Sequence, residues 1–84
     1  MTKLLYFARV RQIVGKGEEE LELPASLATV SDLMSWLTDR DETYAHAFAD
    51  PRIIRAAVDQ THVPHDAPIR GAREIAFFPP VTGG

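Results

Sequence analysis

FFPPVTGG, residues 77–84, closes the sequence. An apolar run typical of a strand stops at two prolines, and proline has no N–H with which to continue a sheet ladder. We therefore predict one domain over residues 1–80 and a flexible tail over residues 81–84. That tail can extend roughly 13 Å at about 3.3 Å per residue. Because glycine has no Cβ, Gly83 and Gly84 would make a tip that fits a narrow channel in another protein.

Length and composition predict one small folded domain. The 84 residues are 45% hydrophobic and 25% charged, which suffices for a single core. A net charge of −3 without a basic stripe argues against a nucleic-acid partner. No apolar stretch approaches the roughly 18 residues of a membrane-spanning helix, and residues 1–5 lack a signal-peptide layout. We therefore expect no membrane partner and a cytoplasmic location.

The sequence has no cysteine, which excludes disulfides and a side-chain thiol nucleophile. His62 and His65 form a short pair without a third ligand, so we expect no metal site. No Gly-x-x-x-x-Gly-Lys-Ser/Thr loop is present, so ATP chemistry, if needed, belongs to a partner. We expect no bound cofactor, and any sulfur chemistry would have to use a group other than a side-chain thiol.

Alternating apolar residues and turn signals predict strands over residues 3–10, 18–23, 53–58 and 73–78. Gly15-Lys16-Gly17 predicts a turn that joins the first two strands as a hairpin, with at most one helical turn before it. The turn-rich segment 59–68 leaves room for one more short strand. We expect the last strand to lie inside the sheet.

Thr29 is a plausible N-cap for a helix, because its hydroxyl can accept a bond from the N–H of Asp32. Apolar residues at helical spacing follow it and predict a core-facing stripe: Val30, Leu33, Met34 and Leu37. Tyr44 and Phe48 suggest a short second helix that ends before Pro51. The order of elements predicts an α+β fold with one main helix packed on one face of a mixed sheet.

Three stretches together resemble the MoaD/ThiS family of ubiquitin-like sulfur carriers. They are LLYFARVR at residues 4–11 with the following Val-Gly, AAVDQ at residues 56–60, and the FFPPVTGG ending, which resembles the molybdopterin branch in particular. The resemblance spans essentially the whole chain and implies a β-grasp fold. Asp59 stands where that family often has asparagine, and both residues stabilise turns through bonds to the backbone.

The resemblance also implies a mechanism centred on Gly84. Its carboxylate would be adenylated by an ATP-dependent, E1-like activating enzyme and converted, with sulfur from a donor protein, to a thiocarboxylate. The tail, formed by Pro80, Val81, Thr82 and Gly83, would insert into the large subunit of molybdopterin synthase and deliver sulfur to cyclic pyranopterin monophosphate. In this scheme the chain is a non-catalytic subunit of a heterotetramer, with the catalytic residues in the large subunit.

Phe78 and His62 are the expected partner-binding residues. An aromatic residue in the last strand, next to a tail that must be threaded, is a reasonable interface anchor, and the alternative for Phe78 is a place in the core. His62 stands where relatives commonly carry an apolar residue near the surface that faces the partner.

Other functions remain open at this point. One is a sulfur carrier for thiamine biosynthesis or for thiolation of transfer RNA. Another is a protein modifier joined to lysines through Gly84, and a third is an interaction domain with an incidental Gly-Gly ending. The Phe-Phe-Pro-Pro lead-in favours the molybdopterin branch.

Overall fold

The structure is a computed structural model and describes residues 1–80. Its elements in chain order are β1 (Thr2–Tyr6), α1 (Ala8–Val14), β2 (Glu18–Leu21), α2 (Val30–Arg40), α3 (Glu42–Ala47), the 3₁₀ turn η1 (Pro51–Ile53), β3 (Arg55–Val58), β4 (Thr61–Val63) and β5 (Glu74–Phe78). Five strands of this part form one mixed sheet in the order β2-β1-β5-β3-β4. β5 is parallel to β1 and antiparallel to β3, so the last strand is central, as expected.

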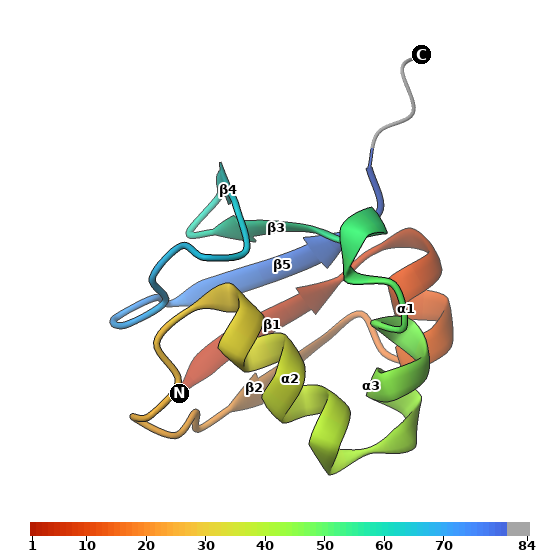
Figure 1. Cartoon of the computed structure of the whole chain (residues 1–84), viewed down its shortest axis with the longest axis horizontal. Coiled ribbons are helices and arrows are strands. Elements are labelled where there is room, and N and C mark those ends of the chain that lie inside the picture. Colours follow the sequence, from red (N-terminus) through yellow and green to blue (C-terminus); the bar gives the residue numbers. More distant parts are fainter. Residues whose placement is uncertain (81–84) are drawn as a thin grey trace.

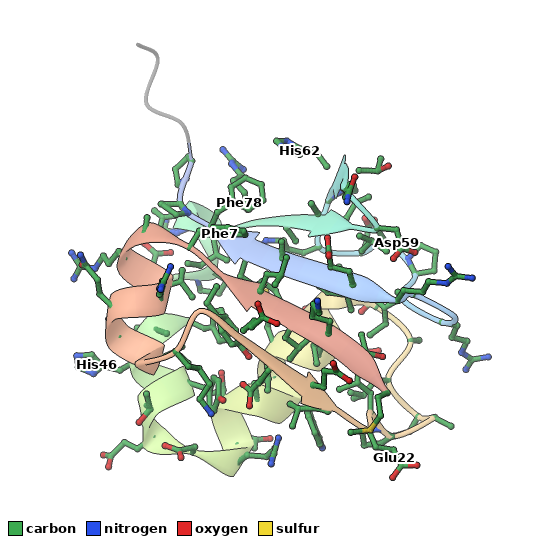
Figure 2. The ribbon with its side chains drawn as sticks, turned by 180° about the vertical axis from the view of Figure 1, so that it is seen from behind. Phe7, Glu22, His46, Asp59, His62 and Phe78 are labelled. Carbon is green, nitrogen blue, oxygen red and sulfur yellow. The ribbon has the colours of Figure 1, made fainter. Side chains whose placement is uncertain are left out.

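The helices cover one face of the sheet, with α2 lying across it (Figure 1). The side chains between the two layers form one core, to which Leu4, Leu33, Leu37, Ile75 and Phe77 contribute fully buried side chains. The opposite face of the sheet is left open among residues 1–80, and Figure 2 looks onto it. The predicted α+β arrangement is therefore confirmed.

The predicted extent of the first strand is wrong. β1 ends at Tyr6, and residues 8–14 form a helix instead of more strand and a single turn. Val10 and Val14 lie one helical turn apart and are both buried, whereas Gln12, which would share their face in a strand, is exposed. Gly15 closes the helix at φ 88°, and its N–H donates to Arg11 O over 2.8 Å.

The connection between the first two strands is therefore a helix rather than a hairpin turn. β1 and β2 still pair antiparallel, with Thr2 opposite Leu21 and Leu5 opposite Glu18. β2 is also shorter than predicted, because it ends at Leu21 before Pro24.

The prediction for the main helix is confirmed. Thr29 caps α2, and its hydroxyl accepts from the Asp32 N–H over 3.1 Å. The Asp32 carboxylate accepts in return from the Thr29 N–H, which completes a capping box. All four residues of the predicted apolar stripe are buried: Val30, Leu33, Met34 and Leu37.

The predicted second helix is present as α3, and both Tyr44 within it and Phe48 at its C-cap are buried. The following strand starts later than predicted. Ile53 belongs to η1, which begins at Pro51, and β3 starts only at Arg55. The Asp50 carboxylate accepts from the Arg52 N–H and caps this turn, so residues 51–53 fold as a 3₁₀ turn rather than as strand.

Candidate functional site: the open face of the sheet and the end of β5

β5 carries the chain out of the sheet between its two neighbours. The strand ends at Phe78, directly before the two prolines, as the sequence predicts. Arg55 of β3 pairs with Phe78 on one side, and on the other the Phe7 N–H donates to Phe77 O over 3.1 Å. Figure 1 shows that β5 ends at the opposite end of the sheet from the N-terminus, in agreement with its parallel pairing to β1.

Pro79 and Pro80 follow the strand and are both half-buried. The remaining residues of the expected tail, Val81, Thr82, Gly83 and Gly84, lie outside the described residues.

Phe77 and Phe78 face opposite sides of the sheet. Phe77 is fully buried in the core, where its ring lies 5.1 Å from Phe48 and 6.2 Å from Tyr6, measured between centroids. Phe78 is half-buried and belongs to the open face, since side chains alternate along a strand. The two adjacent phenylalanines thus have separate surroundings.

One rung of the sheet defines the middle of the open face. Its residues are joined by strand pairing from one edge of the sheet to the other: Glu18, Leu5, Ala76, Ala57 and His62. The centre of the rung is apolar and its side chains project little from the sheet, because two of them are alanine methyl groups. The apolar centre runs up to the end of β5, where the larger aromatic side chains stand.

His62 and Phe78, which the sequence singled out separately, lie together on this face. Their ring centroids are 5.0 Å apart with an interplanar angle of 48°. His62 reaches this position because β4 folds back on β3 and places it opposite Ala57. Figure 2 shows both side chains on the same side of the sheet, at the end where the chain leaves it.

Phe7 completes this group, and the sequence analysis missed it. It follows β1 directly, and 45% of its surface is exposed, which is high for so large an apolar side chain. Figure 2 shows it beside Phe78 near the exit of the chain. The alternation of Tyr6 and Phe7 along a strand indicates that the two side chains face opposite sides of the sheet. Because the strand was predicted to continue to residue 10, Phe7 was not recognised as the residue at its end. We call Phe7, His62 and Phe78 the aromatic patch.

Charged residues of opposite sign flank the aromatic patch and the rung beside it. Glu18 and Glu20 are exposed on β2 at one edge of the sheet, while exposed Arg55 pairs with Phe78 nearer the other edge. Lys3 Nζ lies 3.7 Å from a carboxylate oxygen of Glu18, and the two side chains are 41% and 62% exposed, so this ion pair adds little to stability. The open face is therefore apolar at its centre, with Glu18 and Glu20 of β2 on one side and Arg55 of β3 on the other.

Asp59 holds the turn that carries β4. Its Oδ1 accepts from the N–H groups of Arg73 and Glu74 over 2.9 and 3.0 Å. Asp59 and Gln60 have φ values of 49° and 71°, the left-handed pair of a tight hairpin turn. The expected role of Asp59 in a turn is confirmed, and this turn sets where His62 falls on the open face.

A polar cluster on the helix side of the sheet ties β2 to its neighbours. The Glu19 carboxylate accepts hydrogen bonds from Tyr6 Oη over 2.7 Å, from Tyr44 Oη, and from Lys16 Nζ over 3.2 Å. Burial raises the pKa of Glu19, but these hydrogen bonds outweigh it and hold that pKa below its ordinary value. Burial and the bond to Glu19 raise the pKa of both tyrosines.

The polar side chains of this cluster are hydrogen-bonded to one another, and the cluster lies on the opposite side of the sheet from the aromatic patch. Within residues 1–80, no three His, Asp or Glu side chains are grouped so that they could hold a metal ion. In the same part of the chain, no helix is long and apolar enough to span a membrane.

Comparison with known proteins agrees with this reading of the fold. The family model described as "ThiS family" matches residues 4–84. The molybdopterin synthase sulfur carrier subunit of Escherichia coli K12 is 42% identical over 84 residues, which cover the whole of both chains. The subunit of the same name from Haemophilus influenzae is 32% identical, again over the whole of both chains.

Solved structures extend the similarity to three dimensions. A putative molybdopterin converting factor, subunit 1, from Pyrococcus furiosus has a TM-score of 0.72 at 34% identity, covering 95% of this chain and 97% of that one. Small archaeal modifier protein 1 of H. volcanii has a TM-score of 0.66 at 20% identity over the same shares, which shows a common fold alone. The expected ubiquitin-like β-grasp fold is confirmed, and the chain belongs to the ThiS family.

Proposed function

We propose that this chain is the sulfur carrier subunit of molybdopterin synthase. The observation that carries the proposal is end-to-end similarity to subunits of that name, 42% in the E. coli protein, in a chain whose final Gly-Gly follows a central strand and two prolines. The fold supports it, because the last strand ends at the surface and aims the chain away from the core (Figure 1).

In the proposed reaction the carboxylate of Gly84 is the group that carries sulfur. A carboxylate is a poor electrophile, so it first attacks the α-phosphorus of ATP, displaces pyrophosphate and becomes an acyl-adenylate. Sulfur at the sulfide level, supplied by the donor protein, then attacks the acyl carbon; the bond to AMP breaks, AMP leaves, and a thiocarboxylate remains. This gives a nucleophilic sulfur on a tether, the role that a cysteine thiolate would otherwise fill. The E1-like activating enzyme supplies the ATP site.

The loaded tail would then serve the large subunit. Residues 80–83 reach into its active site, where the thiocarboxylate sulfur attacks a carbon of cyclic pyranopterin monophosphate. Water then cleaves the acyl–sulfur bond and returns Gly84 to a carboxylate, and two such deliveries complete the dithiolene of molybdopterin. Narrow glycines at the tip suit a confined channel. The catalytic acids and bases belong to the large subunit in this proposal, in a cytoplasmic assembly of two small and two large subunits.

We propose the open face as the docking surface for the large subunit, with the aromatic patch as its centre. Three observations support this choice. Phe7, His62 and Phe78 lie next to the point where the tail begins. The rung beside them is apolar. Opposite charges border it, which would fix the orientation of a partner with complementary charge. Aromatic anchors within such a surface are typical interface hot spots.

A loading assay tests the carrier role. The wild-type chain is incubated with the cognate activating enzyme, ATP and a sulfur donor, and its intact mass is measured. We expect one oxygen to be replaced by sulfur at the C-terminus, and no replacement when ATP is omitted. Deletion of Gly84 should abolish loading, because it withdraws the carboxylate by about 3.3 Å, and misplacement by about 1 Å already costs roughly a hundredfold in rate.

A matched control adds one alanine after Gly84, which converts the glycyl carboxylate into an amide and lengthens the tail. This variant should also stay unloaded while its unfolding curve matches that of the wild type. Loading of either variant would contradict the proposal. Recovery of the wild-type chain in amide linkage to lysines of other proteins would favour the modifier function instead.

A further inference from the structure

Ala8 joins β1 to α1 in a backbone conformation that few residue types adopt readily. Its φ is 50°, in the left-handed region, where a Cβ crowds the following carbonyl oxygen. Glycine avoids this crowding, asparagine tolerates it, and a β-branched residue is a genuine outlier there. The Ala8 side chain is exposed, so packing of its methyl group does not explain the conformation.

The residue before it, Phe7, is held by its backbone on both sides. The Phe7 N–H donates to Phe77 O over 3.1 Å, which extends the pairing of β1 with β5 by one step. The Phe7 carbonyl accepts from the Arg11 N–H over 3.3 Å as the N-cap of α1, where no side chain contributes a cap bond. Phe7 thus belongs to the sheet and to the helix at once.

The change of direction between sheet and helix therefore falls on Ala8. α1 is anchored from within, because Val10 and Val14 are 2% and 8% exposed. If Ala8 had a negative φ, the helix could keep those contacts only if Phe7 left its place at the end of the ladder. Phe7 would shift before α1 does, because two backbone hydrogen bonds hold it while its side chain is 45% exposed, whereas the helix is fixed by buried side chains.

We propose that Ala8 is a positioning residue, whose left-handed backbone fixes Phe7 on the open face, beside Phe78, in the orientation that the large subunit binds. This inference rests on the docking surface proposed above. It assigns the effect of Ala8 to its backbone and not to contact of its side chain with the partner.

Two substitutions of similar size separate these effects. Ala8→Val disfavours the left-handed conformation, whereas Ala8→Asn permits it. We expect Ala8→Val to weaken binding of the cognate large subunit by about tenfold or more in isothermal titration. Ala8→Asn and Ala8→Gly should stay within about twofold of the wild type. An equal loss with Ala8→Asn would mean that the side chain touches the partner, and would overturn the proposal.

A cycle with Phe7→Ala tests whether Ala8 acts through Phe7. Phe7→Ala alone should weaken binding by about thirtyfold, the loss typical of a hot spot. Adding Ala8→Val to Phe7→Ala should then cost nothing more. A second, independent loss would overturn the positioning role.

The same cycle distinguishes failure of the inference from failure of the docking surface. If Phe7→Ala weakens binding but Ala8→Val does not, only the positioning role is rejected. If Phe7→Ala leaves the affinity unchanged, the docking surface is itself wrong and the inference is rejected with it.

A measurement on the wild-type chain keeps the test decisive even if Ala8→Val does not fold. The three-bond coupling between HN and Hα of Ala8, with the intraresidue HN–Hα nuclear Overhauser effect, reports the sign of φ in solution. A positive φ at Ala8 is the expected result. A negative φ would overturn the proposal.

Discussion

The His62 imidazole lies against the Phe78 ring, with centroids 5.0 Å apart. The two residues come from different strands, β4 and β5, with β3 between them. Their contact follows from the tight turn after β3, which returns the chain and sets His62 opposite Ala57. An exposed side chain thus covers one flank of an aromatic ring that would otherwise face water. We infer that a partner meets the pair as one surface.

Phe78 and the neighbouring Phe77 should behave differently when truncated. Phe78→Ala should weaken binding of the large subunit by about 2 kcal/mol or more and leave the monomer folded, because Phe78 is on the open face. Phe77→Ala should lower the free energy of unfolding by about 3–5 kcal/mol, because Phe77 is fully buried. Titration calorimetry and chemical denaturation measure the two effects. A monomer unfolded by Phe78→Ala would place Phe78 in the core and reject the docking surface.

Asp59→Ala should destabilise the chain by about 1–2 kcal/mol. The change removes the acceptor of two backbone N–H groups, Arg73 and Glu74, and leaves alanine at a φ of 49°. Asp59→Asn is the matched control, since its amide oxygen can accept the same bonds and asparagine tolerates that φ. Urea denaturation should show a loss for alanine and little change for asparagine. Equal losses would mean that the negative charge of Asp59, and not its acceptor oxygen, holds the turn.

Glu19 should make the stability of the fold depend on pH in acid. The hydrogen bonds to Glu19 hold its pKa below the ordinary value of about 4.3, although burial opposes them. A lowered pKa contributes stability that is present above the ordinary pKa and is lost as pH falls through the folded-state pKa. We therefore expect the free energy of unfolding to decrease below about pH 4.3.

Glu19→Gln tests the origin of this dependence. The variant should lose about 1–2 kcal/mol at pH 7, because a neutral amide replaces a carboxylate that accepts from Tyr6 and Tyr44. It should also have a flatter stability profile in acid. Since the pKa of both tyrosines is raised, their contribution is present below about pH 10 and is lost as pH rises further. Denaturation curves across this pH range that were identical for Glu19→Gln and wild type would refute the assignment.

Leu33 should be among the most sensitive positions of the core. It is fully buried on the face of α2 that packs on the sheet. Leu33→Ala should therefore cost about 2–5 kcal/mol of unfolding free energy, a large share of the stability of a small domain. Ser31→Ala on the exposed side of the same helix is the control and should change little. A denaturation midpoint unchanged by Leu33→Ala would contradict its place in the core.

The sequence predicted those elements whose signals are local and unambiguous. Thr29 and Asp32 stand at the spacing of a capping box, and the apolar residues after them recur only at helical spacing. Both the start of α2 and its buried face could therefore be predicted. β5 was found because two prolines follow it. These two elements, the main helix and the central strand, are the framework of the β-grasp arrangement.

The errors fell where one apolar run serves two elements. The pattern from Leu4 to Val10 is typical of a single strand, but the backbone changes from strand to helix at Ala8. An alanine gives no local signal for a left-handed conformation, which glycine would have given. That error hid both α1 and the exposed position of Phe7. The contact between His62 and Phe78 was likewise beyond the sequence, because it depends on the register of β3 with its two neighbours.

The most direct test of the carrier account is transfer of sulfur in a single turnover. The chain, loaded at Gly84 and purified from activating enzyme, ATP and donor, is mixed with the large subunit and cyclic pyranopterin monophosphate, and both pterin and chain are followed by mass spectrometry. The account predicts that sulfur appears in the pterin as the chain returns to its ordinary carboxylate. Retention of sulfur on Gly84 beside an unchanged pterin, in a complex that has formed normally, would contradict it.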